Sequence, residues 1–118
     1  MNIKEKFAHH LTDIVWPTEK EEKEEYWNVS GIIKNRSNQH LKFDVRIMFN
    51  MPKGELGKKG TTLSKADKMV FETSDEWIVV DLKELHQYIK THKLTVIALE
   101  DIVSKLDWNI FLPKTILK

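Results

Sequence analysis

The chain has 118 residues with 41% hydrophobic and 31% charged side chains, a composition typical of one soluble globular domain, which would span residues 1–118. A net charge of +1 argues against a strongly basic nucleic-acid binder, and the absence of cysteine excludes disulfides, a thiolate nucleophile and sulfur metal ligands. No apolar run approaches the roughly 20 residues that cross a bilayer, and the N-terminus does not resemble a secretory signal. We therefore expect a cytoplasmic protein without membrane contact.

The first expected element is an amphipathic helix over residues 2–15, which Pro17 would end. Five apolar residues recur at the spacing of one helix face: Ile3, Phe7, Leu11, Ile14 and Val15. An acidic run follows at residues 18–25, with five glutamates against two lysines. We interpret this run as a solvated loop.

Two strands, at residues 26–34 and 40–50, are expected to pair as an antiparallel hairpin around a polar turn. The second strand has the clearest pattern in the chain, because large apolar residues alternate strictly with polar ones through HLKFDVRIMFN. Lys42, Asp44 and Arg46 would form a row on its solvated face, with Asp44 in a cross-strand ion pair. The expected core residues are Trp27, Val29, Gly31, Ile33, Leu41, Phe43, Val45, Ile47 and Phe49.

Residues 51–68, MPKGELGKKGTTLSKADK, hold three of the four glycines and five of the nineteen Lys and Arg residues. A phosphate-binding P-loop is excluded, because Thr61 follows Gly60 directly and no helix pattern comes after Thr62. The segment is instead expected to be an adaptable basic loop. Together with the acidic run it can create a local field that the net charge hides, or the two can be solvated loops of opposite sign.

Two more strands, MVFET and WIVVD, are expected on either side of a turn at residues 74–76. A helix would follow from Asp81 to about His92. Asp81 is the expected N-cap, and Glu84 three residues later completes a capping box. Leu82, Leu85 and Ile89 would supply the buried side of this helix.

Residues 94–107 are compatible with a buried strand followed by a short helix, or with one helix capped by Thr95. Their β-branched residues favour the strand. A last strand is expected at residues 108–112. The elements together predict an α+β domain, with a curved, mixed or mostly antiparallel sheet of about six strands and about three helices.

No catalytic or metal-binding pattern stands out. His9 and His10 are adjacent, so on a helix they would point about 100° apart, and His86 and His92 do not have the i, i+4 spacing of paired ligands. No nucleophile elbow is found, and the acids cluster in the exposed run. We expect a protein that is not an enzyme and carries no cofactor and no metal.

The four tryptophans allow two interpretations. Trp27, Trp77 and Trp108 can fill the core of the sheet, which is the common role of such residues. Alternatively, aromatic side chains beside lysine and arginine can stack on unpaired RNA bases.

The opening IKEKFAHHLTDIVWP, the strand HLKFDVRIMF and the tail LDWNIFLP resemble the PrgU-like proteins of enterococcal pheromone-responsive conjugative plasmids. This resemblance covers nearly the whole chain. It implies a PUA-like α+β fold, a fold known for RNA binding. It further implies a cytoplasmic regulator that acts post-transcriptionally to limit the production of plasmid-encoded surface adhesins and so protects the cell from their toxicity.

Two functions therefore compete at this point. The first is RNA binding, with the mRNA of the regulated operon as partner. Its candidate contacts are the exposed cations of the basic loop and of the second strand: Lys42, Arg46, Lys53, Lys58, Lys59, Lys65 and Lys68. The second is a protein-binding module that uses an exposed strand edge or the acidic run at 18–25.

Overall fold

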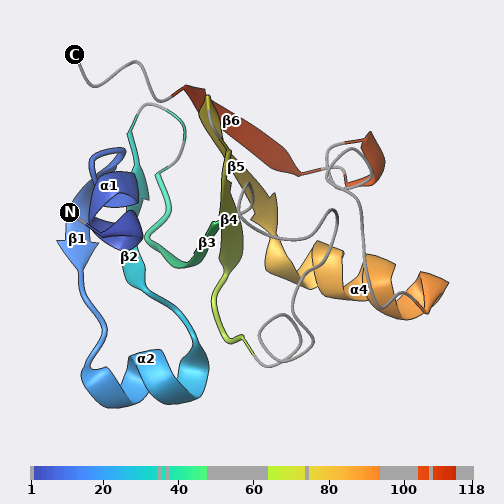
Figure 1. Ribbon diagram of the computed structural model, residues 1–118, viewed down its shortest axis with the longest axis horizontal. Coiled ribbons are helices and arrows are strands. Elements are labelled where there is room, and N and C mark those ends of the chain that lie inside the picture. The colour runs from blue at the N-terminus through green and yellow to red at the C-terminus, as the bar shows by residue number, and fades with distance from the viewer. Residues whose placement is uncertain are drawn as a thin grey trace.

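The structure, a computed structural model, describes residues 2–34, 36, 38–47, 64–73, 75–93, 104–106 and 108–113. Its elements in chain order are α1 (Ile3–Ala8), β1 (Leu11–Val15), α2 (Glu19–Glu25), β2 (Val29–Ile33), β3 (Leu41–Ile47), β4 (Lys68–Glu72), β5 (Glu76–Asp81), α4 (Leu82–His92) and β6 (Asn109–Pro113). In the described part of the chain, six strands form one curled sheet and three helices surround it (Figure 1). The predicted α+β class is confirmed.

The sheet has the strand order β1-β2-β3-β4-β5-β6, so each strand lies beside its neighbours in the sequence. All pairs are antiparallel except β3 and β4, which are parallel with Val45 opposite Val70. The predicted hairpin of β2 and β3 is confirmed. A parallel pair requires a crossover connection, and the basic segment 51–68 runs from the chain between β3 and β4 into the first residue of β4.

The predicted helix over residues 2–15 is wrong beyond Ala8. Asn2 caps the short helix α1, because its side chain accepts a hydrogen bond from the N–H of Glu5 at 2.9 Å. The chain then pairs as β1 with β2, with Leu11 opposite Ile33. The β-branched residues that follow Leu11 favour an extended backbone, and pairing with β2 supplies the hydrogen bonds that a longer helix would have made.

The acidic run forms helix α2 and is not a loop. Thr18 is its N-cap, accepting from the N–H of Glu21 at 3.1 Å, while the Glu21 carboxylate accepts from the N–H of Thr18 at 2.9 Å. No residue of α2 is buried. Glu22 attaches the helix to the domain through Lys4, with 3.0 Å between Nζ and Oε2.

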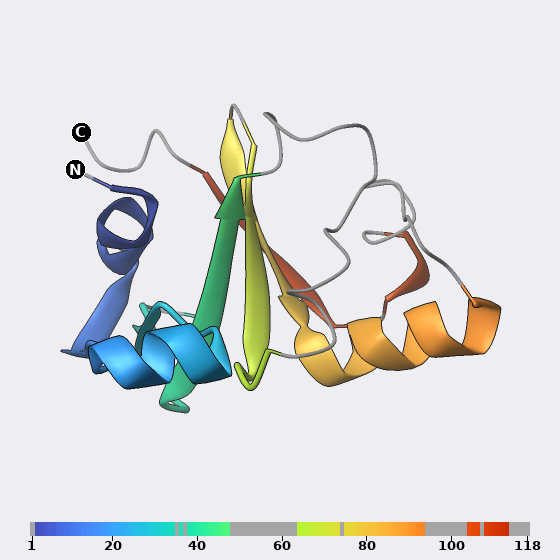
Figure 2. The same cartoon turned by 60° about the horizontal axis from the view of Figure 1, so that its bottom comes forward.

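The core has two parts, one on each face of the sheet. Figure 2 shows α1 at one side of the sheet and α4 at the other. Side chains alternate between the faces along β4, where Val70 joins the part under α1 while Met69 and Phe71 join the part under α4. The part under α1 consists of Phe7, Ala8, Leu11, Val29, Ile33, Phe43, Val45, Val70, Trp77, Val79 and Leu112. The part under α4 consists of Met69, Phe71, Ile78, Val80, Leu82, Leu85 and Leu106. This arrangement fixes α1 and α4 on opposite sides of the sheet.

The C-terminal half follows the sequence pattern closely. Asp81 is the N-cap of α4, accepting from the N–H of Glu84 at 3.0 Å. The carboxylate of Glu84, predicted to complete a capping box, accepts instead from the N–H of Trp108 at 3.0 Å and so attaches α4 to the start of β6. The predicted strand or helix at 94–107 lies outside the described residues, except for 104–106.

Candidate nucleic-acid interface

The seven lysine and arginine residues predicted to bind RNA do not form one free basic surface in the described part of the chain. Lys53, Lys58 and Lys59 lie outside the described residues. Three of the other four contact carboxylates of the protein itself. A cation that already neutralises a carboxylate adds little net positive charge for a phosphate group.

Lys68 is the most completely engaged of these residues. Its Nζ lies 2.8 Å from Oδ1 of Asp81 and 3.8 Å from the centre of the Trp108 ring. Its side chain is only 11% exposed. Lys68 therefore connects β4, the N-terminus of α4 and the start of β6.

Arg46 and Asp44 form a bidentate pair within strand β3. Nε and Nη2 of Arg46 each donate to a different carboxylate oxygen of Asp44, both at 2.9 Å. The pair joins residues i and i+2 of one strand, where a cross-strand pair was expected. The Asp44 side chain is 5% exposed, so the predicted solvated row is buried at this point. Planar bidentate pairs of this kind hold the guanidinium firmly.

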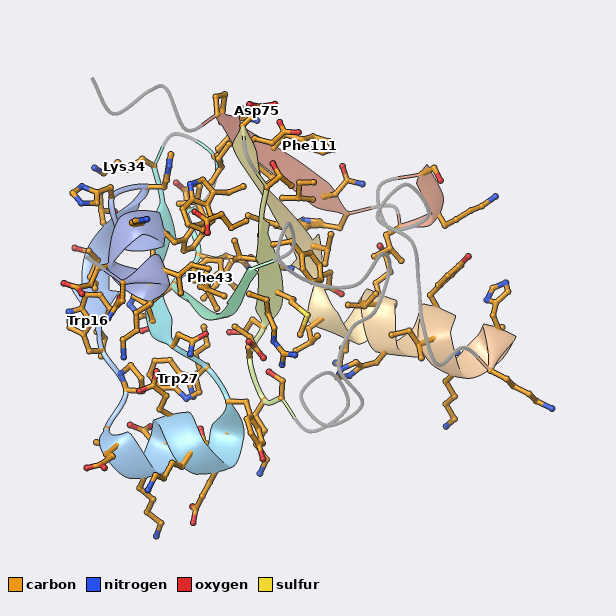
Figure 3. All side chains as sticks on the ribbon, viewed as in Figure 1. Trp16, Trp27, Lys34, Phe43, Asp75 and Phe111 are labelled. Atoms are coloured by element: carbon orange, nitrogen blue, oxygen red, sulfur yellow. The ribbon has the colours of Figure 1, made fainter. Side chains whose placement is uncertain are left out.

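Lys42 and Lys65 are the described candidates that still face solvent. Lys42 Nζ lies 4.0 Å from Oε1 of Glu25 and 5.1 Å from the centre of the Trp27 ring, and its side chain is 44% exposed. Trp27 lies beside α2, with its indole N–H donating to Glu25 at 3.0 Å (Figure 3). Lys65 is exposed, and its backbone N–H donates to the carbonyl of Glu25 at 2.8 Å. Both cations therefore lie next to the acidic helix.

A second surface, on α4, combines aromatic and cationic groups. An open groove of about 310 Å³ lies along one side of the helix, and we call it the α4 groove. Its lining residues are Glu84, Gln87, Tyr88, Thr91, His92, Lys105 and Leu106. Sequence reasoning missed this surface, although the i, i+4 spacing of Tyr88 and His92 indicated that both rings share one face of the helix.

The rings of Tyr88 and His92 pack against each other in this groove. Their centres are 4.3 Å apart, and the ring planes are inclined by 34°. Nδ1 of His92 lies 3.0 Å from the carbonyl oxygen of Tyr88. A carbonyl can only accept, so in this contact Nδ1 carries the proton, and Nε2 of a neutral ring is an acceptor.

Helices α4 and α2 carry opposite charges. With its two caps, α4 carries Lys83, Lys90 and Lys93 against Asp81 and Glu84. Asp81 is paired with Lys68, whereas the three lysines have no ion-pair partner among the described residues. Helix α2 carries five glutamates against two lysines. The two helices lie well apart in both views of the ribbon (Figures 1 and 2). An anion is therefore attracted to the α4 end and repelled from the α2 end.

One buried histidine, His10, belongs to neither α2 nor the α4 groove. His10 is 4% exposed and lies against the rings of both Phe7 and Trp77, at 6.2 and 6.4 Å between centres. Its Nε2 has no hydrogen-bond partner in the described part of the structure. Burial, together with the positive charge of Lys34 and of His9, lowers the pKa of His10 below its ordinary value.

In the ranges that the structure describes, no three His, Cys, Asp or Glu residues gather as a metal site would require. None of the described helices has the length and apolar character needed to span a membrane. Comparisons with protein-family models, with curated proteins and with solved structures found no match to this chain.

Proposed function

We propose that this protein is an RNA-binding regulator and that single-stranded RNA lies on the α4 groove. The observation that carries the proposal is the contact between the Tyr88 and His92 rings in a groove that Lys105 also lines. An unpaired base presents a flat aromatic face, and each base stacked on an aromatic side chain contributes about 1–3 kcal/mol to single-strand binding. The groove offers such a face with a cation next to it.

The polar groups of the groove match the remaining needs of a nucleotide. Gln87, whose Nε2 donates to Thr91 Oγ1 at 3.1 Å, retains its amide oxygen as an acceptor for a base edge. Lys105 would contact a phosphate, and Lys90 and Lys93 on the same end of the helix would extend the positive track. These lysines also offset the negative end of the helix dipole, which alone would repel phosphate.

The regulatory part of the proposal comes from the resemblance to the PrgU-like proteins. The bound RNA would be the message of an operon that encodes conjugative-plasmid surface adhesins, and binding would lower their production. The basic segment 51–68, with Lys53, Lys58 and Lys59, would add sequence-independent contacts to the RNA backbone.

Titration of a labelled single-stranded RNA of roughly 16 nucleotides, a typical upper site size for one domain, tests the proposal. Tyr88→Leu keeps the packing of a half-buried side chain but removes the aromatic face, and we expect about tenfold weaker binding. For variants that lose lysines near the groove, the matched control is the double variant Lys20→Gln with Lys23→Gln, because it removes two exposed cations from α2. Equal affinity of Tyr88→Leu and the parent protein would contradict the assignment of the groove.

A further inference from the structure

The most exposed apolar surface of the described residues lies at one edge of the sheet. Ile14, Val15 and Trp16 are 38%, 53% and 46% exposed, and they are consecutive. Trp16 projects outward at the margin of the molecule (Figure 3). Since β1 is the first strand of the sheet and pairs only with β2 among the described strands, its outer side is an open edge. Natural proteins usually protect such an edge with charges, because it can pair with another chain.

The backbone of this edge presents a matched donor and acceptor. Ser30 Oγ donates to the carbonyl oxygen of Val15 at 3.0 Å, so this carbonyl faces β2. The C=O and N–H of one trans peptide point in opposite directions, and the N–H of Trp16 therefore faces outward. Backbone groups alternate sides along a strand, so the C=O of Ile14 faces outward as well.

Only a short segment of this edge is available for pairing with another chain. Asp13 has a φ of 52°, and the register of β1 against β2 shifts between Thr12 and Val15, which marks a bulge. Pairing from outside is therefore confined to residues 14–16.

Opposite charges lie beyond the two ends of this segment. On the C-terminal side, Pro17 leads directly into α2 with its excess of glutamates, of which Glu19 and Glu24 are exposed. On the N-terminal side the exposed Asp13 comes first, and beyond it lie the exposed residues His9 and Lys34, with Lys34 Nζ donating to the carbonyl of His9 at 2.9 Å. Figure 3 shows Trp16 between Lys34 and helix α2 along the same margin.

We propose that this edge binds a second copy of the chain, through antiparallel pairing of the two β1 strands about a two-fold axis at Val15. The N–H of Trp16 would donate to the carbonyl of Ile14 of the second copy, and the reverse bond would follow by symmetry. Each Trp16 would cover Ile14 of the other copy. The inference does not depend on RNA binding.

Charge complementarity selects a second copy as the occupant. Antiparallel pairing places the acidic end of one edge against the basic end of the other, so Glu19 faces Lys34 of the second copy at both ends of the contact. A parallel arrangement would bring like charges together, which costs affinity. Because only a few residues of each chain take part, the interface is at the small end of specific contacts, and the dimer should dissociate on dilution to about 1 μM.

Sedimentation velocity across a concentration series tests the proposal, with an increase from one chain mass to two as the expected result. Val15→Lys places two lysines opposite each other at the two-fold axis and should weaken association at least about tenfold. Phe111→Lys is the matched control, because Phe111 is 38% exposed on the opposite edge strand β6, and it should leave association unchanged. Melting temperatures near that of the parent would show that both variants fold.

A charge swap tests the antiparallel arrangement. Lys34→Glu should weaken association by about threefold to tenfold at low salt, as expected for exposed ion pairs, and adding Glu19→Lys to the same chain should restore it. A single-chain mass at every concentration would overturn the proposal and leave the edge to a different protein. Weaker association without restoration in the double variant would overturn the antiparallel pairing.

Discussion

Lys68 holds its ammonium group 3.8 Å from the centre of the Trp108 ring. The same nitrogen lies 2.8 Å from Oδ1 of Asp81, the N-cap residue of α4. One lysine thus joins three elements that are distant in the sequence. A residue that the sequence suggested for RNA contact is part of the framework that positions the α4 groove.

Replacing Lys68 by Met is predicted to destabilise the protein by about 1–3 kcal/mol, because it leaves the Asp81 carboxylate without its closest cation and removes the cation–π contact. Urea unfolding measures this decrease. The exposed neighbour Lys65, changed to Met, should alter the free energy of unfolding by less than about 0.5 kcal/mol. Equal stability of the two variants would contradict the structural role of Lys68.

Asp81 has two separable roles, N-cap of α4 and partner of Lys68. Asp81→Asn retains a capping oxygen and removes the charge, whereas Asp81→Ala removes both. We expect the alanine variant to be less stable than the asparagine variant by about 1 kcal/mol, the usual contribution of an N-cap. Thermal unfolding of the two variants side by side gives this difference, and identical midpoints would show that the cap contributes nothing.

Val45 is 7% exposed in the core under α1, on the central strand β3. Val45→Asp would bury a carboxylate with no cation partner, and the chain should fail to fold. Thr12→Asp makes a similar change at an exposed position of β1 and should be tolerated. Circular dichroism distinguishes the outcomes. A cooperative melt of Val45→Asp near the parent's temperature would contradict the placement of the Val45 side chain in the core.

His10 should make stability depend on pH. Its pKa in the folded protein is lower than the ordinary value of 6.5, so the unfolded chain binds the proton more readily. The stabilising contribution of neutral His10 is complete above pH 6.5 and decreases as the pH falls toward the folded-state value. His10→Leu should reduce the decrease in unfolding free energy between about pH 7.5 and 5.5. Parallel pH profiles for the parent and His10→Leu would refute this.

The parts of the fold that local pattern decides could be predicted from the sequence. Strict alternation located β3, and Asp81 marked the start of α4, because burial of one face and an N-cap act within a few residues. Leu11 was expected to be buried, and it is, but on a strand. Its spacing from Ile3 and Phe7 fits a helix as well as a helix followed by a strand, so periodicity could not decide between them.

What could not be predicted depends on distant partners. The parallel pairing of β3 with β4 and the contact of Lys68 with Trp108 join segments far apart in the sequence. Helix α2, in contrast, had a local signal in Thr18 and Glu21, the ends of a capping box, but charge density suggested a solvated loop. The α4 groove was missed for another reason, since its Lys105 lies outside the helix that carries Tyr88 and His92.

The salt dependence of RNA binding tests the central claim most directly. A plot of the logarithm of the association constant against the logarithm of salt concentration should become shallower by about 0.7 for each single-strand phosphate that the protein no longer neutralises. Replacing Lys93 and Lys105 together by glutamine, or changing Lys58 and Lys59 to glutamate, should lower the slope and the affinity for many RNA sequences with little change in melting temperature. The Lys20→Gln and Lys23→Gln control should keep the parent slope. An unchanged slope in both folded test variants would contradict RNA binding at these surfaces.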